Sequence, residues 1–225
     1  MTKFLTLALS ASTMALGLAA APVSAQVNGI ATASPEAVVV QSQARAAAYQ
    51  AINTQYAAQL QQATTLNTEM ATLRASLDTD GDQQVSEAEV AANPAVIQQM
   101  QQKQQQSDTV LQPLRLAQVY VIDQLTQNYE AARNQVLSTK GIQMLLTPEA
   151  IQYAPDGINV TSDILAAFNQ RTPNVPSTPP AEYQPTAQAV QNFQQIQQII
   201  GALVQRQALQ QQAQQQQATP APSGR

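Results

Sequence analysis

The clearest candidate for chemistry in this 225-residue chain is an acidic run that matches the calcium-binding loop of an EF-hand. A hard cation such as Ca²⁺ requires six or seven oxygen ligands, and alternate residues of one tight loop all point inward. With Asp78 as the first of twelve positions, oxygen-bearing groups fall where such a loop carries its ligands. The expected ligands are Asp78, Asp80, Asp82, Gln84 through its backbone carbonyl, Ser86 and Glu89. The spacing therefore predicts a calcium site, which we expect to be weak.

The sixth position of this loop departs from the pattern. An EF-hand carries glycine there for the sharp turn, whereas this chain has Gln83, for which such a backbone is strained. The alternative interpretation is an acidic turn that connects two helices and binds no metal. Five carboxylates within twelve residues repel one another without a counter-ion, which favours a metal. A single loop without a paired partner indicates a structural role rather than a switch.

Two long helical segments flank the loop and must position it. In the first segment, nine positions follow alternating steps of three and four residues, and eight of the nine are apolar, which is typical of a coiled-coil seam. These positions are Tyr49, Ile52, Tyr56, Gln59, Ala63, Leu66, Met70, Leu73 and Leu77. The second segment is less regular, with Ile97, Met100, Leu111, Leu114, Val121, Leu125 and Ala132 on the same stepping. A helical hairpin is therefore predicted.

The hairpin is expected to have three parts. Its first arm covers 36–77 as an uninterrupted helix after the start signal Ser-Pro-Glu, the acidic loop covers 78–89, and the return arm covers 95–138. Pro113 lies inside the return arm and is expected to kink it, because proline removes a backbone hydrogen bond.

Short strands are predicted at both ends of the hairpin. The first covers 29–33, and two more cover 142–146 and 150–153, followed by a helix over 162–169 with Thr161 as its cap. Three short strands make a poor sheet with a small core. The base over 141–169 is therefore expected to associate with copies of itself.

The composition excludes several kinds of function. The chain has no cysteine, histidine or tryptophan, which excludes Cys or His nucleophiles, a histidine base and most zinc sites. Its formal net charge is −4, which makes nucleic acid an unfavourable partner. No catalytic constellation is present, so we expect no enzyme.

The two ends of the chain carry separate signals. Residues 1–25 are typical of a secretory signal peptide, with the mature chain starting at Gln26; the alternative is a membrane anchor. Residues 172–185 form a proline-rich linker, 186–217 a Gln-rich helix, and 218–225 a tail expected to be disordered. The helix carries an apolar stripe of Ala189, Phe193, Ile196, Ile200 and Leu203.

The base resembles a known family. Residues 141–153 read Gly-Ile-Gln-Met-Leu-Leu-Thr-Pro-Glu-Ala-Ile-Gln-Tyr, and residues 159–165 read Asn-Val-Thr-Ser-Asp-Ile-Leu. Together with the order of elements over 29–171, they resemble the OmpH/Skp family of periplasmic chaperones, which identifies 26–171 as an OmpH/Skp-like domain. The resemblance implies a mainly α, α+β fold and a homotrimer whose hairpins surround a cavity. Family members hold unfolded outer-membrane proteins there without ATP. The best-known members are strongly basic, whereas this chain is acidic.

The leading functional hypothesis is therefore a periplasmic, ATP-independent holdase that binds unfolded outer-membrane proteins. The alternative is a structural or adaptor coiled-coil protein of the cell envelope with a calcium-stabilised hairpin tip. A calcium-storage or sensor protein is less well supported, because the chain has only one loop.

Overall fold

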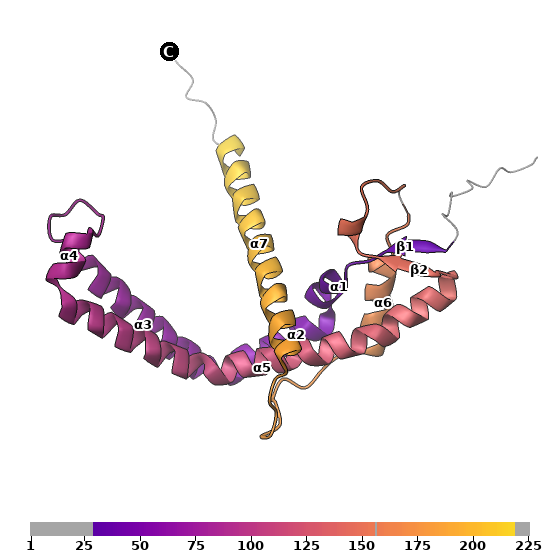
Figure 1. Ribbon diagram of the computed structural model, residues 1–225, viewed down its shortest axis with the longest axis horizontal. Helices are drawn as coiled ribbons and strands as arrows, with labels where there is room; N and C mark the ends of the chain where they lie inside the picture. The colour runs from indigo at the N-terminus through magenta and orange to yellow at the C-terminus, as the bar shows by residue number, and fades with distance from the viewer. Residues whose placement is uncertain (1–28, 156, 219–225) are drawn as a thin grey trace, which may run out of the picture.

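The computed structural model describes residues 29–155 and 157–218 (Figure 1). The predicted signal peptide lies outside these residues, as does the predicted tail apart from its first residue. The described part is mainly helical with one small parallel sheet, which confirms the predicted fold class. None of its helices combines the length and the apolar character needed to cross a bilayer.

The hairpin is the longest feature of the molecule (Figure 1). One side contains three consecutive helices, and the other side is a single long helix that packs against them. A loop and a short helix connect the two sides at the far tip. The helices are α1 (Pro35–Gln41), α2 (Gln43–Gln55), α3 (Ala57–Ala75), α4 (Glu87–Ala92) and α5 (Pro94–Lys140).

The prediction of one uninterrupted first arm is wrong, because the helix is broken at Ser42 and at Tyr56. The Ser42 side chain accepts a hydrogen bond from the Arg45 N–H and so caps α2, while its own hydroxyl donates to the Val39 carbonyl. The free N–H of Gln43 donates to the side chain of Asn169, which lies on a distant helix. The break therefore has both a local cap and a tertiary partner, whereas α3 begins at Tyr56 without a side-chain cap.

The coiled-coil seam lies where the spacing predicts it. All nine seam positions of the first arm are buried or half-buried, and most positions between them are exposed. On the outer part of α5, the stepping that contains Ile97 and Met100 would next place Gln104 on the seam. In the structure, Lys103 is half-buried instead and Gln104 is exposed. Lys103 forms an ion pair with Glu69 across the two arms. A lysine stem therefore fills a place where the sequence offers no apolar residue.

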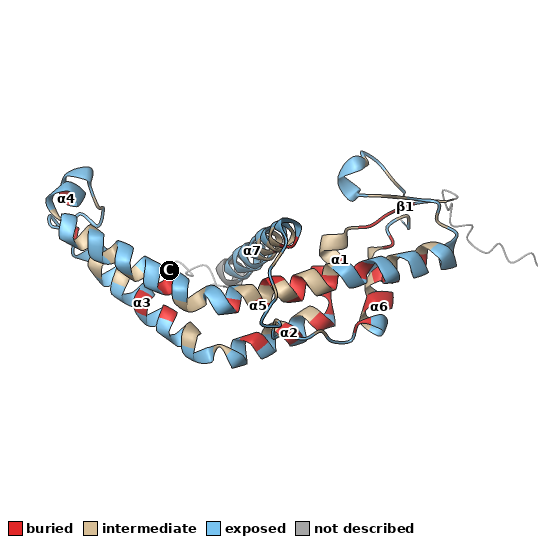
Figure 2. Ribbon diagram, turned by 60° about the horizontal axis from the view of Figure 1, so that its bottom comes forward, coloured by how far each residue is buried: buried red, intermediate tan, exposed pale blue. Residues whose placement is uncertain are grey.

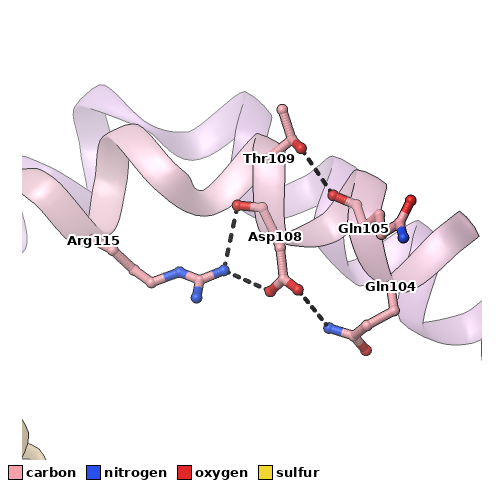
Figure 3. A network of polar contacts seen from close by, with 5 residues as sticks. All are labelled: Gln104, Gln105, Asp108, Thr109 and Arg115. Carbon is pink, nitrogen blue, oxygen red and sulfur yellow. Dashed lines mark hydrogen bonds and ion pairs between the residues drawn. The ribbon is translucent and has the colours of Figure 1, made fainter. Parts of the chain in front are cut away.

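Helix α5 continues through Pro113 and bends between its arm half and its base half (Figure 1). Proline removes the N–H that would bond the carbonyl of Thr109. Next to this position, the Arg115 guanidinium donates to the carboxylate of Asp108 at 2.7 Å and to its backbone carbonyl at 3.3 Å (Figure 3). The exposed network of Asp108 and Arg115 therefore spans the turn that contains the proline.

The sheet joins the two ends of the hairpin. Strand β1 (Ile30–Thr32) pairs in parallel with β2 (Met144–Leu146), with Ile30 opposite Met144. The prediction of a further strand over 150–153 is wrong. Pro148–Ala150 forms one turn of 3₁₀ helix, because a proline at its start sets a turn rather than an extended chain. The free side of β1 instead bonds the segment around Asn159, through a bridge to Thr32.

The core lies at the base of the hairpin, where α1, α2, α5 and α6 (Thr161–Arg171) meet (Figure 2). Thr161 does not cap α6 as predicted; its hydroxyl oxygen accepts a hydrogen bond from the Ser34 N–H. This contact joins the start of α6 to the start of α1. The fully buried side chains include Val38, Ile52, Val121, Ile122, Leu125, Ile164 and Phe168.

The segment predicted as a linker contains no helix or strand, but it packs along the hairpin. Tyr183 donates a hydrogen bond to the Asp123 carboxylate, and its ring lies edge-on to Tyr120 with centroids 4.7 Å apart. Burial and the Asp123 carboxylate raise the pKa of Tyr183 to about 12. Helix α7 (Ala187–Ala218) follows and buries Ala189 and Ile196 against the base.

Candidate functional site

The structure brings three of the six predicted calcium ligands together at the hairpin tip. One carboxylate oxygen from each of Asp78, Asp80 and Asp82 lies within 4.8 Å of the others. The three side chains come from alternate positions of a single loop, as the EF-hand pattern predicts. This cluster of hard oxygen ligands suits a cation such as Ca²⁺ better than a transition metal.

The aspartates also hold the loop in shape. Asp78 accepts hydrogen bonds from the N–H of Gly81 at 2.7 Å and of Gln83 at 2.9 Å. Asp82 accepts one from the Gln84 N–H at 2.7 Å. These bonds hold the chain in an inward turn. The carboxylates that accept them also have oxygens that lie close to one another.

The strain expected at the sixth loop position is present. Gln83 has a φ of +64°, and it is the only non-glycine residue in the described part of the chain with a positive φ. A side chain in this left-handed conformation costs roughly 1–2 kcal/mol relative to glycine. The loop therefore keeps the shape that a glycine would adopt freely.

Glu89 does not join the three aspartates. Its Oε1 accepts hydrogen bonds from the backbone N–H and hydroxyl of Thr79, at 2.6 and 2.9 Å. Its Oε2 accepts bonds from the backbone N–H and hydroxyl of Ser86, both at 2.8 Å. The bonds from Ser86 and Thr79 lower the pKa of Glu89 to about 2. Binding a cation through Glu89 would require these donors to be exchanged for the ion.

Ser86 and Glu89 instead form a capping box at the start of α4. Ser86 accepts a hydrogen bond from the Glu89 N–H, while Glu89 accepts from the Ser86 N–H. The spacing Ser-x-x-Glu before a helix is a sequence signature of this motif, and it overlaps the last four loop positions. The sequence therefore also predicts a capping box formed by Ser86 and Glu89, and the sequence analysis missed this signal.

The arms carry a polar surface with few charges rather than an apolar pocket. In the described part of the chain, the large exposed apolar residues lie in the base, in α4 and in α7, and none lies on the arm faces of α3 and α5. A shallow groove of about 450 Å³ follows the two arms. It is lined by Gln62, Gln102, Gln105, Gln106, Thr109 and Val110. Such a surface offers many amide hydrogen bonds and little apolar area.

The architecture defines a class of protein in which a helical hairpin projects from a small base. The family described as outer membrane protein (OmpH-like) matches residues 29–168, which contain the hairpin, the sheet and most of α6. The chain belongs to this OmpH-like family. The predicted family resemblance is thereby confirmed.

A solved structure also resembles the chain. It is the crystal structure of an outer membrane chaperone candidate (OmpH-like) from Caulobacter crescentus, with 18% sequence identity and a TM-score of 0.42. The similarity covers 72% of this chain and 94% of the other. No curated protein matches the chain.

Proposed function

We propose that this protein is an ATP-independent holdase chaperone of the periplasm that binds unfolded outer-membrane proteins between the helical arms of a homotrimer. The observation that carries the proposal is the family match over 29–168, because it includes both the arms and the base. The family match also supports a role other than that of an enzyme.

The base supports self-association. Each strand of its sheet is three residues long, and in the described part of the chain β2 has a strand partner on one side only. Ile30 and Met144, which face each other in the register, are 37% and 52% exposed. A sheet shared with further copies would cover these side chains and pair the open edge.

The arms support many weak contacts. Their exposed positions are rich in Gln and Thr, whose side chains can bond the unpaired backbone of an unfolded chain. Because Gln and Thr side chains are uncharged, binding through them should depend little on salt, in contrast to capture by a basic surface.

Two measurements test this function. The protein, without ATP, should keep a denatured β-barrel outer-membrane protein soluble on dilution into buffer, whereas an equal mass of an unrelated helical protein should not. Light scattering with small-angle X-ray scattering should give roughly 66 kDa for three mature chains and a hollow, elongated shape. A monomer without effect on aggregation would contradict the proposal and favour the envelope adaptor.

Export is part of the same proposal. We expect the protein in the periplasmic fraction, starting at Gln26. N-terminal sequencing of the purified protein would measure this directly.

The tip loop is proposed to bind Ca²⁺ weakly, with a dissociation constant of about 10⁻⁴ to 10⁻³ M. The cation would offset the repulsion among Asp78, Asp80 and Asp82 and so fix the tip. Calorimetric titration should detect binding in the wild type, loss of binding in Asp80→Asn, and tighter binding in Gln83→Gly. Absence of binding in both the wild type and Gln83→Gly would show that the loop is a turn without metal.

A further inference from the structure

Helix α7 carries one apolar stripe that is only partly covered. Its inner part packs on α1 and α5, where Ala189 and Ile196 are 1% and 3% exposed and Phe193 and Ile200 are half-buried. The next residues on the same helical face are Leu203 and Val204, which are 41% and 60% exposed. The face that docks α7 on the base therefore continues beyond the base into solvent.

The outer half of α7 stands away from the rest of the chain (Figures 1 and 2). Every residue from Gly201 to Gln214 is exposed. The eighteen residues from Gly201 to Ala218 extend about 27 Å at the usual helical rise. Isolated helices of this length are marginal in water, because most helical stability in proteins comes from packing. A helix with one continuous apolar stripe in this situation indicates a missing partner.

The charge of this segment restricts the kind of partner. Residues 201–218 contain one charged side chain, Arg206, and no acid. Two identical segments therefore repel each other very little. Their remaining side chains are mainly Gln, whose amides both donate and accept and so pair with copies of themselves.

We propose that the outer half of α7 is a docking surface for α7 of a second copy of this chain, with Leu203 and Val204 at the contact. The stripe continues an interface that the chain already uses, and α7 lies outside the family-matched residues 29–168. The contact therefore adds to any assembly of the base. It does not depend on client binding.

The absence of cysteine from the chain makes a direct test feasible, since an introduced thiol is the only one present. We expect oxidation of Leu203→Cys and of Gln207→Cys, one turn further along the stripe, to join chains covalently. Gln205→Cys lies about 150° around the helix from the centre of the stripe and is the matched control. Where two thiols face each other in an assembly, their effective concentration is in the millimolar range. At micromolar protein, the stripe variants should therefore cross-link at least roughly ten times faster than Gln205→Cys.

A second set of variants links the effect to the apolar contact. In the Gln207→Cys background, Leu203→Gln with Val204→Gln should reduce cross-linking to the rate of the control, while Leu209→Gln, away from the stripe, should leave it unchanged. Equal rates for all three single-cysteine variants would overturn the proposal. Cross-linking only to an added unfolded client would also overturn it and would identify the client as the occupant. Light scattering on the same samples separates failure of this contact from failure of the base to assemble.

Discussion

The base and the tip of the hairpin are held by different forces. At the base, side chains from α1, α2, α5 and α6 enclose Phe168 and Ile164, which have no exposed surface. At the tip, carboxylates bond to the backbone of an exposed loop, and Leu77 and Glu89 are its only buried residues. Apolar burial involves no titratable group, whereas hydrogen bonding by a carboxylate is weakened when the carboxylate is protonated. One continuous hairpin therefore combines a base whose core does not respond to pH with a tip that does.

The largest effect is expected from a cavity in the base. Phe168→Ala should lower the free energy of unfolding by about 3–5 kcal/mol, because a fully buried aromatic ring is removed. Chemical denaturation measures this change. Tyr153→Ala, at an exposed position of the same base, is the control and should change stability by less than about 0.5 kcal/mol. Equal effects of the two substitutions would contradict the assignment of the core.

A cavity in the arm should act locally. Leu66→Ala removes a buried seam residue and should cost about 2–3 kcal/mol, at the low end for leucine because the seam is narrow and can collapse. Hydrogen exchange should accelerate in α3 and in the outer half of α5, while amides in the base keep their protection. Asn67→Ala, on the exposed face, should leave exchange unchanged. A uniform acceleration across the chain would mean that the arms and base unfold as one unit.

The tip should respond to pH through Glu89. Its pKa in the folded state, about 2, lies below the ordinary value of 4.5. Its contribution to the stability of the tip is therefore complete above pH 4.5 and is lost as the pH falls toward 2. The protection of the Thr79 and Ser86 amides, measured against the exchange rate of an unfolded peptide at the same pH, should fall over that interval. Glu89→Gln should make this protection low and independent of pH, whereas Glu87→Gln, on the exposed side of α4, should retain the wild-type profile. A wild-type profile in Glu89→Gln would remove the carboxylate from the explanation.

The smallest effect is expected at the junction of α1, α5 and α7. The hydroxyl of Tyr129 is buried and has no hydrogen-bond partner, so Tyr129→Phe should leave stability unchanged or raise it by up to about 1 kcal/mol. Tyr49→Phe is the matched comparison. The Tyr49 hydroxyl accepts a bond from Gln197 on α7, and its removal should lower stability by about 0.5–1.5 kcal/mol. A loss of stability in both variants would indicate that the Tyr129 hydroxyl has a hydrogen-bond partner.

The sequence predicts the hairpin because its evidence is periodic and local. Seam spacing from Tyr49 to Leu77 is a repeated signal, and each position agrees with the next. The break at Ser42 has a local cap, but its tertiary partner is Asn169, which bonds the N–H of Gln43 from 126 residues away. The packing of the proline-rich segment likewise depends on the distant contact of Tyr183 with Asp123. No local pattern contains such contacts, so these features could not be predicted.

The candidate site shows the same limit at shorter range. The aspartates converge as their alternate spacing predicts, and Gln83 adopts the positive φ expected of its position. Glu89 satisfies two patterns at once, the last ligand of a calcium loop and the third residue of a capping box. Sequence spacing does not rank two overlapping motifs. In the structure both carboxylate oxygens of Glu89 accept hydrogen bonds within the chain, and those from Ser86 belong to the capping box.

The parallel pairing of β1 with β2 has a consequence for the order in which the chain folds. β1 lies at the start of the hairpin, but its partners around Met144 and Asn159 lie on the order of a hundred residues further along the chain. The arms, whose contacts cross a shorter separation, can form while that strand still has two open edges. Closure of the sheet is then a late step, and until it occurs the chain carries an unpaired strand that can pair with strands of other chains.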